Sequence, residues 1–380
     1  MNKFLHAVFI VPALIILFIA SAFIVWQFMP KHALNVVVLD KTVTINIIND
    51  NYNKPVQYRK HMGFYWILRY NHYVKPSNNE YYDYKRDYYG PKAGINGTVI
   101  DNTSIKLSST PDLIYLSDAY GTDAISREPQ SGLTPNEVSV VSQAILHGST
   151  LVGEFNIEPS NIGNPVKNDI ESIFGIKYSG WTGRLVADLA NLNDIPAWVL
   201  KLYESNYHKQ WNFVGSGIVL ASNDSKIIIL QQGKDYTNSL NIKIKEAYLK
   251  KYGNLKVNYY NWFEILTPEN GIETVAEFNI PLTYDGRLKF NKISSADSFP
   301  AITLKRNEDA PVYYFAGDFN DYVAQEQYGD FVFADTYNRI FAYDKPGDNA
   351  NFFWNFYTPF MEVVLKDAEY NSANKTPLNK

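Results

Sequence analysis

Four apolar runs of this 380-residue chain each end in an acidic residue. Short apolar runs of this kind are typical of strands that are buried on both faces of a parallel sheet. The carboxyl ends of parallel strands meet at one edge, where ligands bind in open α/β folds. The sequence therefore predicts a single crevice lined by carboxylates. The runs are VVVLD to Asp40, LIYLSD to Asp118, TLVGE to Glu154 and VYYFAGD to Asp318.

Helix-start signals between these runs support a parallel sheet. Residues 134–137 (TPNE) combine a threonine cap, a proline at the first helical position and a glutamate that completes a capping box, and Gly148 supplies a stop. A helix there, between the strand ending at Asp118 and one beginning at Thr150, makes a right-handed βαβ unit. Asn164-Pro165 repeats the cap-and-proline pattern before Gly175.

The second half of the chain has a different pattern of apolar and polar residues. Residues 215–292 fall into short alternating runs separated by Asn, Asp and Gly, including GRLKFNKI at 286–293, which predicts an antiparallel β insertion. A buried strand at Val312–Ala316 and a closing helix at Ala350–Lys366, kinked at Pro359, complete the core. We predict an α/β fold with a mainly parallel sheet flanked by helices. Its parts are a membrane anchor (1–30), the α/β domain (31–194 and 301–368), a β-rich insertion (195–300) and a flexible tail (369–380).

The amino-terminal segment from Ala7 to Phe28 carries no charge and is long enough to cross a bilayer as a helix. We interpret it as a retained signal anchor, because Met29-Pro30-Lys31-His32 is a poor cleavage site. A cleaved signal peptide is the alternative. The anchor predicts a single-pass protein of the cell membrane with the bulk of the chain extracytoplasmic, although Lys3 and Lys31 give almost no orientation bias.

Composition excludes several kinds of chemistry. The chain has no cysteine, which removes disulfides, thiolate zinc sites and cysteine nucleophiles. Its net charge of −4 argues against a nucleic-acid partner. No phosphate-binding loop or nucleophile elbow is present, so we expect no cofactor. The run Asp318-Phe319-Asn320-Asp321 falls far short of a calcium loop, so we expect no metal.

A family resemblance rests on the order of these segments. A strand ending in LSDAYG, a threonine-capped helix, the strand TLVGEF and a late strand VYYFAGD before a terminal helix resemble the class I glutamine amidotransferase-like fold, in the branch of the ThuA-like domains. The resemblance covers residues 35–188 and 311–367. Catalytic members carry a cysteine after the strand that corresponds to TLVGEF, whereas this chain has Gly153-Glu154-Phe155-Asn156. The resemblance therefore implies a binding crevice without amidotransferase activity.

Each candidate site residue has a structural alternative. Asp40 and Asp118 could cap turns instead of binding a ligand. Glu154 lies within an apolar run and needs either a ligand or a partner such as Arg59, Lys60 or Arg184. Trp181, on a glycine-flanked loop shared with Arg184, and Trp66 could stack on sugar rings or simply pack in the core. The predicted ligand-binding residues are Asp40, Asp118, Tyr120, Glu154, Asn156, Trp181, Arg184 and Asp318.

Two functions fit these features. The first is a non-catalytic, membrane-anchored accessory that binds a glycan or an envelope partner in bacterial envelope or exopolysaccharide metabolism. The second is a carboxylate-dependent glycan hydrolase, in which Glu154 and Asp118 serve as acid and base. The expected partners are the membrane and polysaccharide or envelope-synthesis proteins. The loss of the amidotransferase cysteine favours the binding protein.

Overall fold

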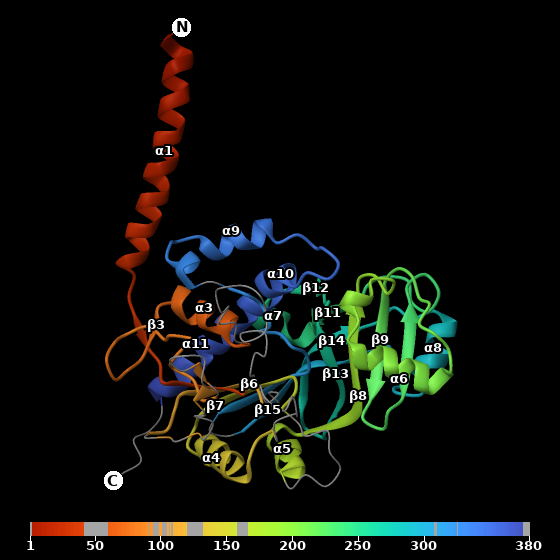
Figure 1. The fold of residues 1–380 in the computed structure, drawn as a ribbon. Helices are drawn as coiled ribbons and strands as arrows, with labels where there is room; N and C mark the ends of the chain where they lie inside the picture. The colour runs from red at the N-terminus through yellow and green to blue at the C-terminus, as the bar shows by residue number, and fades with distance from the viewer. Residues whose placement is uncertain are drawn as a thin grey trace.

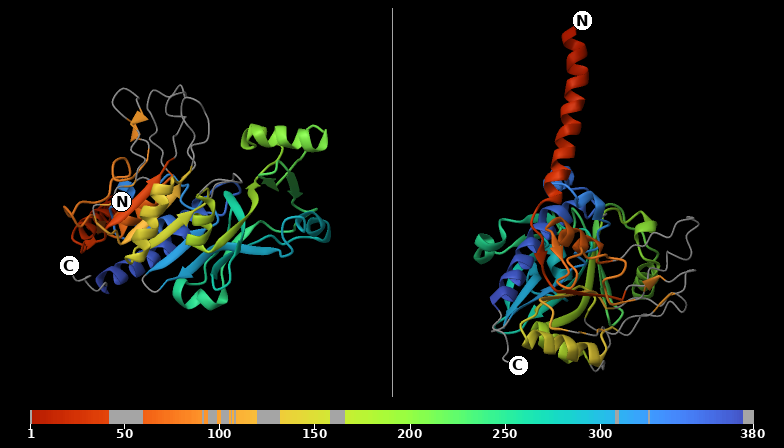
Figure 2. Two further views of the ribbon diagram at one scale, coloured as in Figure 1. Left: turned by 90° about the horizontal axis from the view of Figure 1, so that it is seen from below. Right: turned by 90° about the vertical axis from the view of Figure 1, so that its left-hand side faces the viewer.

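The computed structural model describes residues 2–41, 60–90, 92–93, 99–100, 105, 107, 109–119, 132–157, 166–307, 310–324 and 326–374. Its first element, α1 (Asn2–Gln27), projects as an isolated helix from the body of the molecule (Figures 1 and 2). The segment Ile10–Gln27 is long and apolar enough to cross a membrane, a property that signal sequences share. The predicted residues Arg59, Tyr120 and Asn164-Pro165 lie outside the described part of the chain.

Four parallel strands form one half of an eight-stranded sheet, in the order β16-β7-β6-β2. All five residues of β7 are buried, as expected for a strand covered on both faces. The helix α4 (Pro135–Leu146) joins β6 to β7, and Thr134 and Glu137 form the predicted capping box. The predicted βαβ unit is therefore confirmed. The strands are β2 (Val36–Asp40), β6 (Leu113–Asp118), β7 (Thr150–Glu154) and β16 (Pro311–Phe315).

The other half of the same sheet is antiparallel, in the order β12-β11-β14-β15, and β15 pairs with β16. Buried and partly exposed residues alternate along β11, as expected for a strand with one buried face. The class is thus α/β with a mixed sheet. These strands are β11 (Asn241–Ile244), β12 (Lys256–Asn258), β14 (Glu273–Asn279) and β15 (Ser298–Arg306).

A second, four-stranded antiparallel sheet lies at the right of Figure 1, in the order β10-β9-β8-β13. Helix α6 (Ala197–Tyr207) packs on it through Val199, which shares a small core with Val219 and Ile229. The strands of the predicted insertion are therefore divided between this sheet and the central one. Its strands are β8 (Ile176–Val186), β9 (Gly217–Ser222), β10 (Ile227–Gln231) and β13 (Trp262–Pro268).

Three local predictions are wrong. The run at 286–293 forms most of helix α8 (Tyr284–Phe290), because the Thr283 side chain caps the Gly286 N–H. The expected loop at 180–184 is part of strand β8. The tail does not begin at residue 369, since α11 (Thr358–Asn374) continues and Glu369 lies 2.8 Å from His32 Nδ1.

The closing helix changes its winding before Pro359. Helix α10 (Ala350–Phe352) leads into a π-helical turn at Phe353–Tyr357, and α11 follows directly. Pro359 has no N–H to donate to the carbonyl of Asn355, so the regular ladder is interrupted there. This wider turn lies directly before the residue at which the sequence predicts a kink.

The remaining elements are short. The aromatic run His61–Val74 predicts one helix, but helix α3 (Met62–Tyr70) ends earlier, because Tyr73–Val74 forms β3 and pairs with β1. The others are β1 (His32–Ala33), β4 (Lys92–Ala93), β5 (Val99–Ile100), α5 (Lys167–Phe174), α7 (Leu249–Tyr252) and α9 (Ala334–Phe341).

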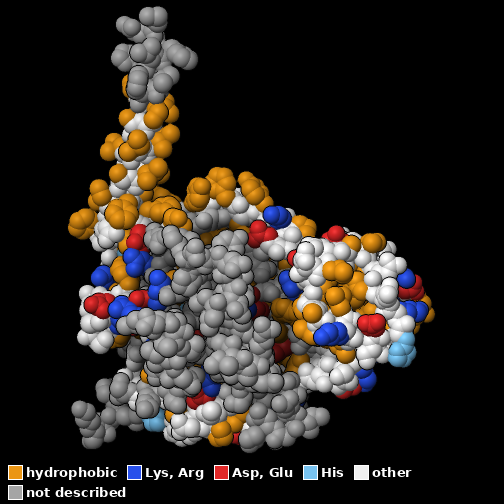
Figure 3. All heavy atoms as spheres, in the orientation of Figure 1, with side chains coloured by type: hydrophobic (Ala, Val, Ile, Leu, Met, Phe, Trp, Pro, Cys, Tyr) orange, Lys and Arg blue, Asp and Glu red, His pale blue; other side chains and the backbone are white. Residues whose placement is uncertain are grey.

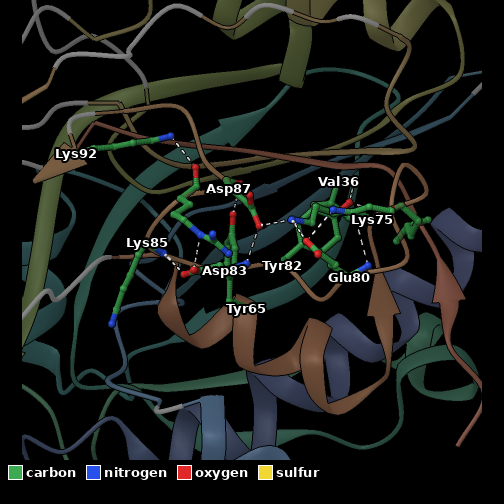
Figure 4. A network of polar contacts seen from close by, with 12 residues as sticks. Val36, Tyr65, Lys75, Glu80, Tyr82, Asp83, Lys85, Asp87 and Lys92 are labelled. Carbon is green, nitrogen blue, oxygen red and sulfur yellow. Dashed lines mark hydrogen bonds and ion pairs between the residues drawn. The ribbon is translucent and has the colours of Figure 1, made fainter. Parts of the chain in front are cut away.

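The tyrosine-rich segment after α3 covers the outer edge of β2. The Tyr82 hydroxyl accepts from the Val36 N–H at 2.8 Å and donates to the Leu34 carbonyl at 2.6 Å. The Tyr89 N–H donates to the Val38 carbonyl, and the Asp40 N–H donates to the Tyr89 carbonyl. Figure 4 shows Tyr82 directed at Val36 within this polar network. Three backbone groups of β2 on this side, the Val36 N–H, the Val38 carbonyl and the Asp40 N–H, are therefore paired within the chain.

Candidate functional site

The four parallel strands bring their acidic ends to one edge of the central sheet. Asp40, Asp118 and Glu154 are the last residues of β2, β6 and β7, and Asp318 follows β16. Lys60, just before α3, joins this edge: its ammonium donates to Asp318 Oδ2 at 2.6 Å and to Asp321 Oδ2 at 2.8 Å. The structure thus brings together carboxylates from distant segments, as the sequence predicts.

Lys60 is the central cation of this edge, and its side chain is only 20% exposed. Burial alone would lower the pKa of Lys60, but the negative charges of Asp318, Asp118 and Glu154 raise the pKa above its ordinary value. The ammonium stays charged and bridges the two aspartates. Among the described residues, no group of three or more His, Asp or Glu side chains could hold a metal ion.

Glu154 lies beneath the edge and is 1% exposed. Its Oε1 accepts from the Asn320 N–H at 2.5 Å and its Oε2 accepts from the Tyr115 hydroxyl at 2.8 Å. Burial, followed by repulsion from Asp318, raises the pKa of Glu154 well above its ordinary value. The predicted partner Arg184 does not supply these hydrogen bonds. Glu154 instead fixes the backbone of the segment that carries Asp318 and Asp321.

Asp40 is also enclosed. Its Oδ2 lies 2.7 Å from His61 Nδ1, while His61 Nε2 donates to the Tyr84 carbonyl at 2.7 Å, and both side chains are 0% exposed. Asp40 therefore acts on the site through its charge. Burial first, and then the charge of Asp40, raises the pKa of Asp321 to about 6.

Asp118 and Asn156 form the part of the edge nearest to β13. Asn156 Nδ2 donates to Asp118 Oδ1 at 3.0 Å, and the Asn156 N–H donates to Glu264 Oε1 at 3.1 Å. Glu264 Oε2 accepts from the Tyr314 hydroxyl at 2.5 Å. Burial raises the pKa of Glu264 to about 7. Glu264 is not among the predicted site residues, although its position in the apolar run WFEIL is the same signal that identifies Glu154.

Trp181 and Arg184 lie on opposite faces of β8, because they are three residues apart in an extended strand. The Arg184 guanidinium lies 5.7 Å from the ring centroid of Trp262, and it interacts with the charge of Asp318. Trp181 instead lines a cavity of about 990 Å³ together with Tyr178 and Tyr207. The loop predicted for these residues would have presented them together; the strand separates them.

The tryptophans near the edge are not those that the sequence suggested. Trp66 is 1% exposed and stacks on Tyr70, so its predicted role in sugar binding is wrong. Trp262 is half-buried, and its ring lies 6.0 Å from that of Trp198, which is 49% exposed. Trp262 also accepts, through its carbonyl, the N–H of Asp318 at 2.9 Å.

We name the resulting arrangement the edge site. It combines one ammonium, several carboxylates, two amides and an arginine whose guanidinium lies over a tryptophan ring. Asn261 completes it, since Asn261 Nδ2 donates to the Asp318 carbonyl at 3.1 Å and to Asp321 Oδ2 at 3.3 Å. The residues of the edge site are Lys60, Asp118, Asn156, Arg184, Asn261, Trp262, Asp318 and Asp321.

No protein-family model and no curated protein matches the chain. Among solved structures it is similar to a β-galactosidase from Bacillus circulans sp. alkalophilus, at 12% identity and a TM-score of 0.27 over 55% of this chain and 21% of that one. It is also similar to the carbohydrate deacetylase Agd3, at 9% identity and a TM-score of 0.34 over 76% and 30%. A cytoplasmic protein from Salmonella typhimurium gives 10% identity and a TM-score of 0.36 over 88% and 98%.

The chain spans less than a third of the length of the two carbohydrate-active enzymes. All three TM-scores lie below 0.5, so these similarities carry no argument about fold or function. The resemblance to the amidotransferase-like fold stays a prediction.

Proposed function

We propose that this protein is a membrane-tethered, extracytoplasmic protein that binds a carbohydrate chain at the edge site. The observation that carries the proposal is the half-buried Trp262 beside the bridged pair Asp318 and Asp321. Sugars present apolar C–H faces, which pack on indole rings, and hydroxyls, which pair with carboxylates, amides and ammonium groups. Trp198, exposed next to Trp262, extends this aromatic surface.

The other parts of the proposal follow from the sequence. Helix α1 supplies the tether, and the α/β core is proposed to belong to the amidotransferase-like type with its crevice retained and its nucleophile absent. The partners proposed for such a protein are polysaccharides or the proteins that make or export them. Glu154 and Asp40 support the site without touching ligand, because both are enclosed by protein donors.

The direct test is glycan binding by the full chain in detergent micelles, measured by calorimetry against bacterial polysaccharides. Trp262→Ala removes the aromatic surface and should weaken binding about fivefold, since an aromatic contact is worth about 1 kcal/mol. Trp181→Ala is the matched control, because Trp181 lies on the face of β8 that is opposite to Arg184, and Arg184 is the residue that pairs with Trp262. If Trp181→Ala weakens binding and Trp262→Ala does not, the ligand occupies the 990 Å³ cavity and the edge-site proposal is wrong.

One observation favours glycan hydrolysis as the second candidate. Asp318 and Asp321 share one ammonium, and burial raises the pKa of Asp321 to about 6, so Asp321 can carry the proton of a general acid next to a second carboxyl group. Release of reducing ends from a bound polysaccharide would establish turnover. In that case Asp321→Asn should abolish release and preserve binding, and the activity of the parent chain should fall above about pH 6.

A further inference from the structure

Helix α9 has the reverse of the usual amphipathic arrangement. A surface helix of a soluble protein turns its apolar stripe inward and its charged face outward. In α9 the side chains of Ile340 and Phe341 point to the outside three and four residues after that of Tyr337, and the exposed Phe333 before the helix and Tyr343 after it extend this stripe. We call this stripe the α9 face; its members are Phe333, Tyr337, Ile340, Phe341 and Tyr343, which are 58%, 56%, 66%, 53% and 70% exposed.

The polar side of α9 faces the protein. Arg339 lies 3.4 Å from Glu362 on α11 and 3.5 Å from Asp335. Asp335 in turn accepts a hydrogen bond from the Tyr70 hydroxyl on α3. The helix is thus attached to the body through charges and hydrogen bonds. Its orientation is therefore fixed, and the apolar residues cannot turn inward without breaking these pairs.

The backbone at the start of α9 also holds an aromatic residue outward. Phe333 has φ +71°, in the left-handed region that bulky residues rarely adopt. A Phe in that conformation is costly, and here the side chain gains little burial in return, since it is 58% exposed. Phe333 is therefore exposed although both the backbone preference of a phenylalanine and the hydrophobic effect oppose this arrangement.

The α9 face lies beside the base of α1. The Val332 N–H donates to the Ala22 carbonyl at 3.3 Å, and Phe333 and Met29 line the same cavity of about 430 Å³. Trp26 of α1 is 1% exposed and donates from Nε1 to the Tyr70 carbonyl at 3.4 Å, which docks α1 on the body. Figures 1 and 3 show α9 on the side from which α1 extends, with its apolar side chains on that side.

The position along α1 at which Val332 contacts Ala22 is consistent with α9 lying at the surface of a bilayer. Ala22 lies five residues before the end of α1 at Gln27, which is about 8 Å along the helix axis. Interfacial amphipathic helices bury their apolar face roughly 5–10 Å into the boundary between headgroups and acyl chains. A bilayer crossed by α1 would therefore meet α9 at the level where such helices bind, and Tyr and Phe are well suited to that region.

We propose that α9 is an interfacial helix whose apolar face enters the outer surface of the same bilayer that α1 crosses. This inference rests on the membrane tether of the proposed function. With two contacts to the bilayer, the transmembrane helix and the α9 face, the body is held in one orientation relative to the membrane. The edge site then has a fixed position above the membrane surface.

The experiment uses the absence of cysteine in the chain, which allows single cysteines to be labelled in the full protein. Ile340→Cys reports on the α9 face, Leu146→Cys is a control at the end of α4, and Ile16→Cys reports on α1. The three native side chains are 66%, 66% and 67% exposed, so labelling is matched. Each variant carries an environment-sensitive fluorophore and is reconstituted in phosphatidylcholine and phosphatidylglycerol vesicles containing nitroxide-labelled lipid.

We expect severalfold quenching at Ile340 and Ile16 and none at Leu146. Quenching at Ile16 with none at Ile340 would overturn the interfacial helix and leave the tether standing. Quenching at Ile340 with none at Ile16 would support α9 binding to lipid and refute the membrane span. A blue shift of the Ile340 label that depends on protein concentration in micelles, and not on lipid, would assign the α9 face to a second copy of the chain and overturn the proposal.

Discussion

The edge site and the α9 face depart in opposite ways from the rule that charges lie outside and apolar groups inside. At the edge site, carboxylates are partly buried, and the Lys60 ammonium compensates the charges of Asp318 and Asp321. The Asp318 side chain is only 9% exposed. At the α9 face, apolar side chains are turned outward while Arg339 is turned toward the body. The buried charges of the edge site are neutralised by partners within the chain. The exposed apolar side chains of the α9 face are not covered by any described residue, so an external apolar phase is needed to cover them.

This difference separates two kinds of functional surface. A site for a polar ligand must stay charged and yet keep a precise shape, so its ions are tied to one another and to backbone groups. A surface for a lipid boundary needs no shape beyond a continuous apolar stripe. Mutations should therefore affect the two regions differently: they should destabilise the protein at the edge site, and they should change only membrane contact at the α9 face.

The largest effect is expected for Lys60→Met. The variant leaves Asp318 and Asp321 without their shared cation in a partly buried place, and removing one partner of such a group costs about 3 kcal/mol of unfolding free energy. Lys226→Met is the matched control, because Lys226 pairs with Asp224 while 66% exposed and should leave stability unchanged. Denaturant unfolding in mild detergent measures both. Equal losses for the two variants would contradict the idea that the edge-site charges depend on each other.

The next effect concerns pH. Burial raises the pKa of Glu264 to about 7 from an ordinary value of 4.5, so the folded chain holds a proton that the unfolded chain has lost between these values. The contribution of protonated Glu264 to the unfolding free energy is full below about pH 4.5 and is lost as the pH rises through 7. From pH 5 to 8 this amounts to about 2 kcal/mol.

Glu264→Gln should remove this slope, so that its stability falls less than that of the parent chain between pH 5 and 8. Thermal unfolding across this range is the measurement. Glu273→Gln is the control, since the Arg306 side chain lowers the pKa of Glu273 and the carboxylate is already ionised in this window. A slope that persists in the Glu264 variant would show that another group is responsible.

The smallest effect is expected on α9. Arg339→Met removes contacts to Glu362 and Asp335 and should cost about 1 kcal/mol, because the pair is partly screened by solvent. Tyr337→Ala, on the outward stripe, should change the unfolding free energy by less than that, although it shortens the apolar face. Chemical unfolding in micelles compares the two. A larger loss for Tyr337→Ala would mean that the α9 face packs against protein.

The sequence predicts the parallel half of the sheet well because its signals are local. The capping box at Thr134 and the apolar runs before Asp118 and Glu154 each specify one element, and strand adjacency then brings their ends together. The antiparallel half could not be placed, because alternation shows that a strand has one buried face without showing which sheet it joins. The run at 286–293 has a strand-like pattern, so the sequence does not predict helix α8. The helix forms because the Thr283 side chain caps its first turn.

The candidate site was predictable only in part for a similar reason. The acids are visible because a charge inside an apolar run is unusual, and this applies equally to Glu264. Lys60 has no such signal: it lies in a polar stretch, and only the fold brings it to Asp318 and Asp321. Trp181 and Arg184 were placed together because glycines suggested a loop; in the strand, Gly180 at φ +82° forms a bulge instead.

The covered edge of β2 has a consequence for a protein gathered at high density on a surface. An open edge strand is a template to which the sheet of a neighbouring molecule can add, and crowding in two dimensions would favour such polymerisation. Tyr82 and Tyr89 occupy the Val36 N–H, the Val38 carbonyl and the Asp40 N–H, three of the groups that a foreign strand would need. Strand addition on this flank would first have to displace both tyrosines.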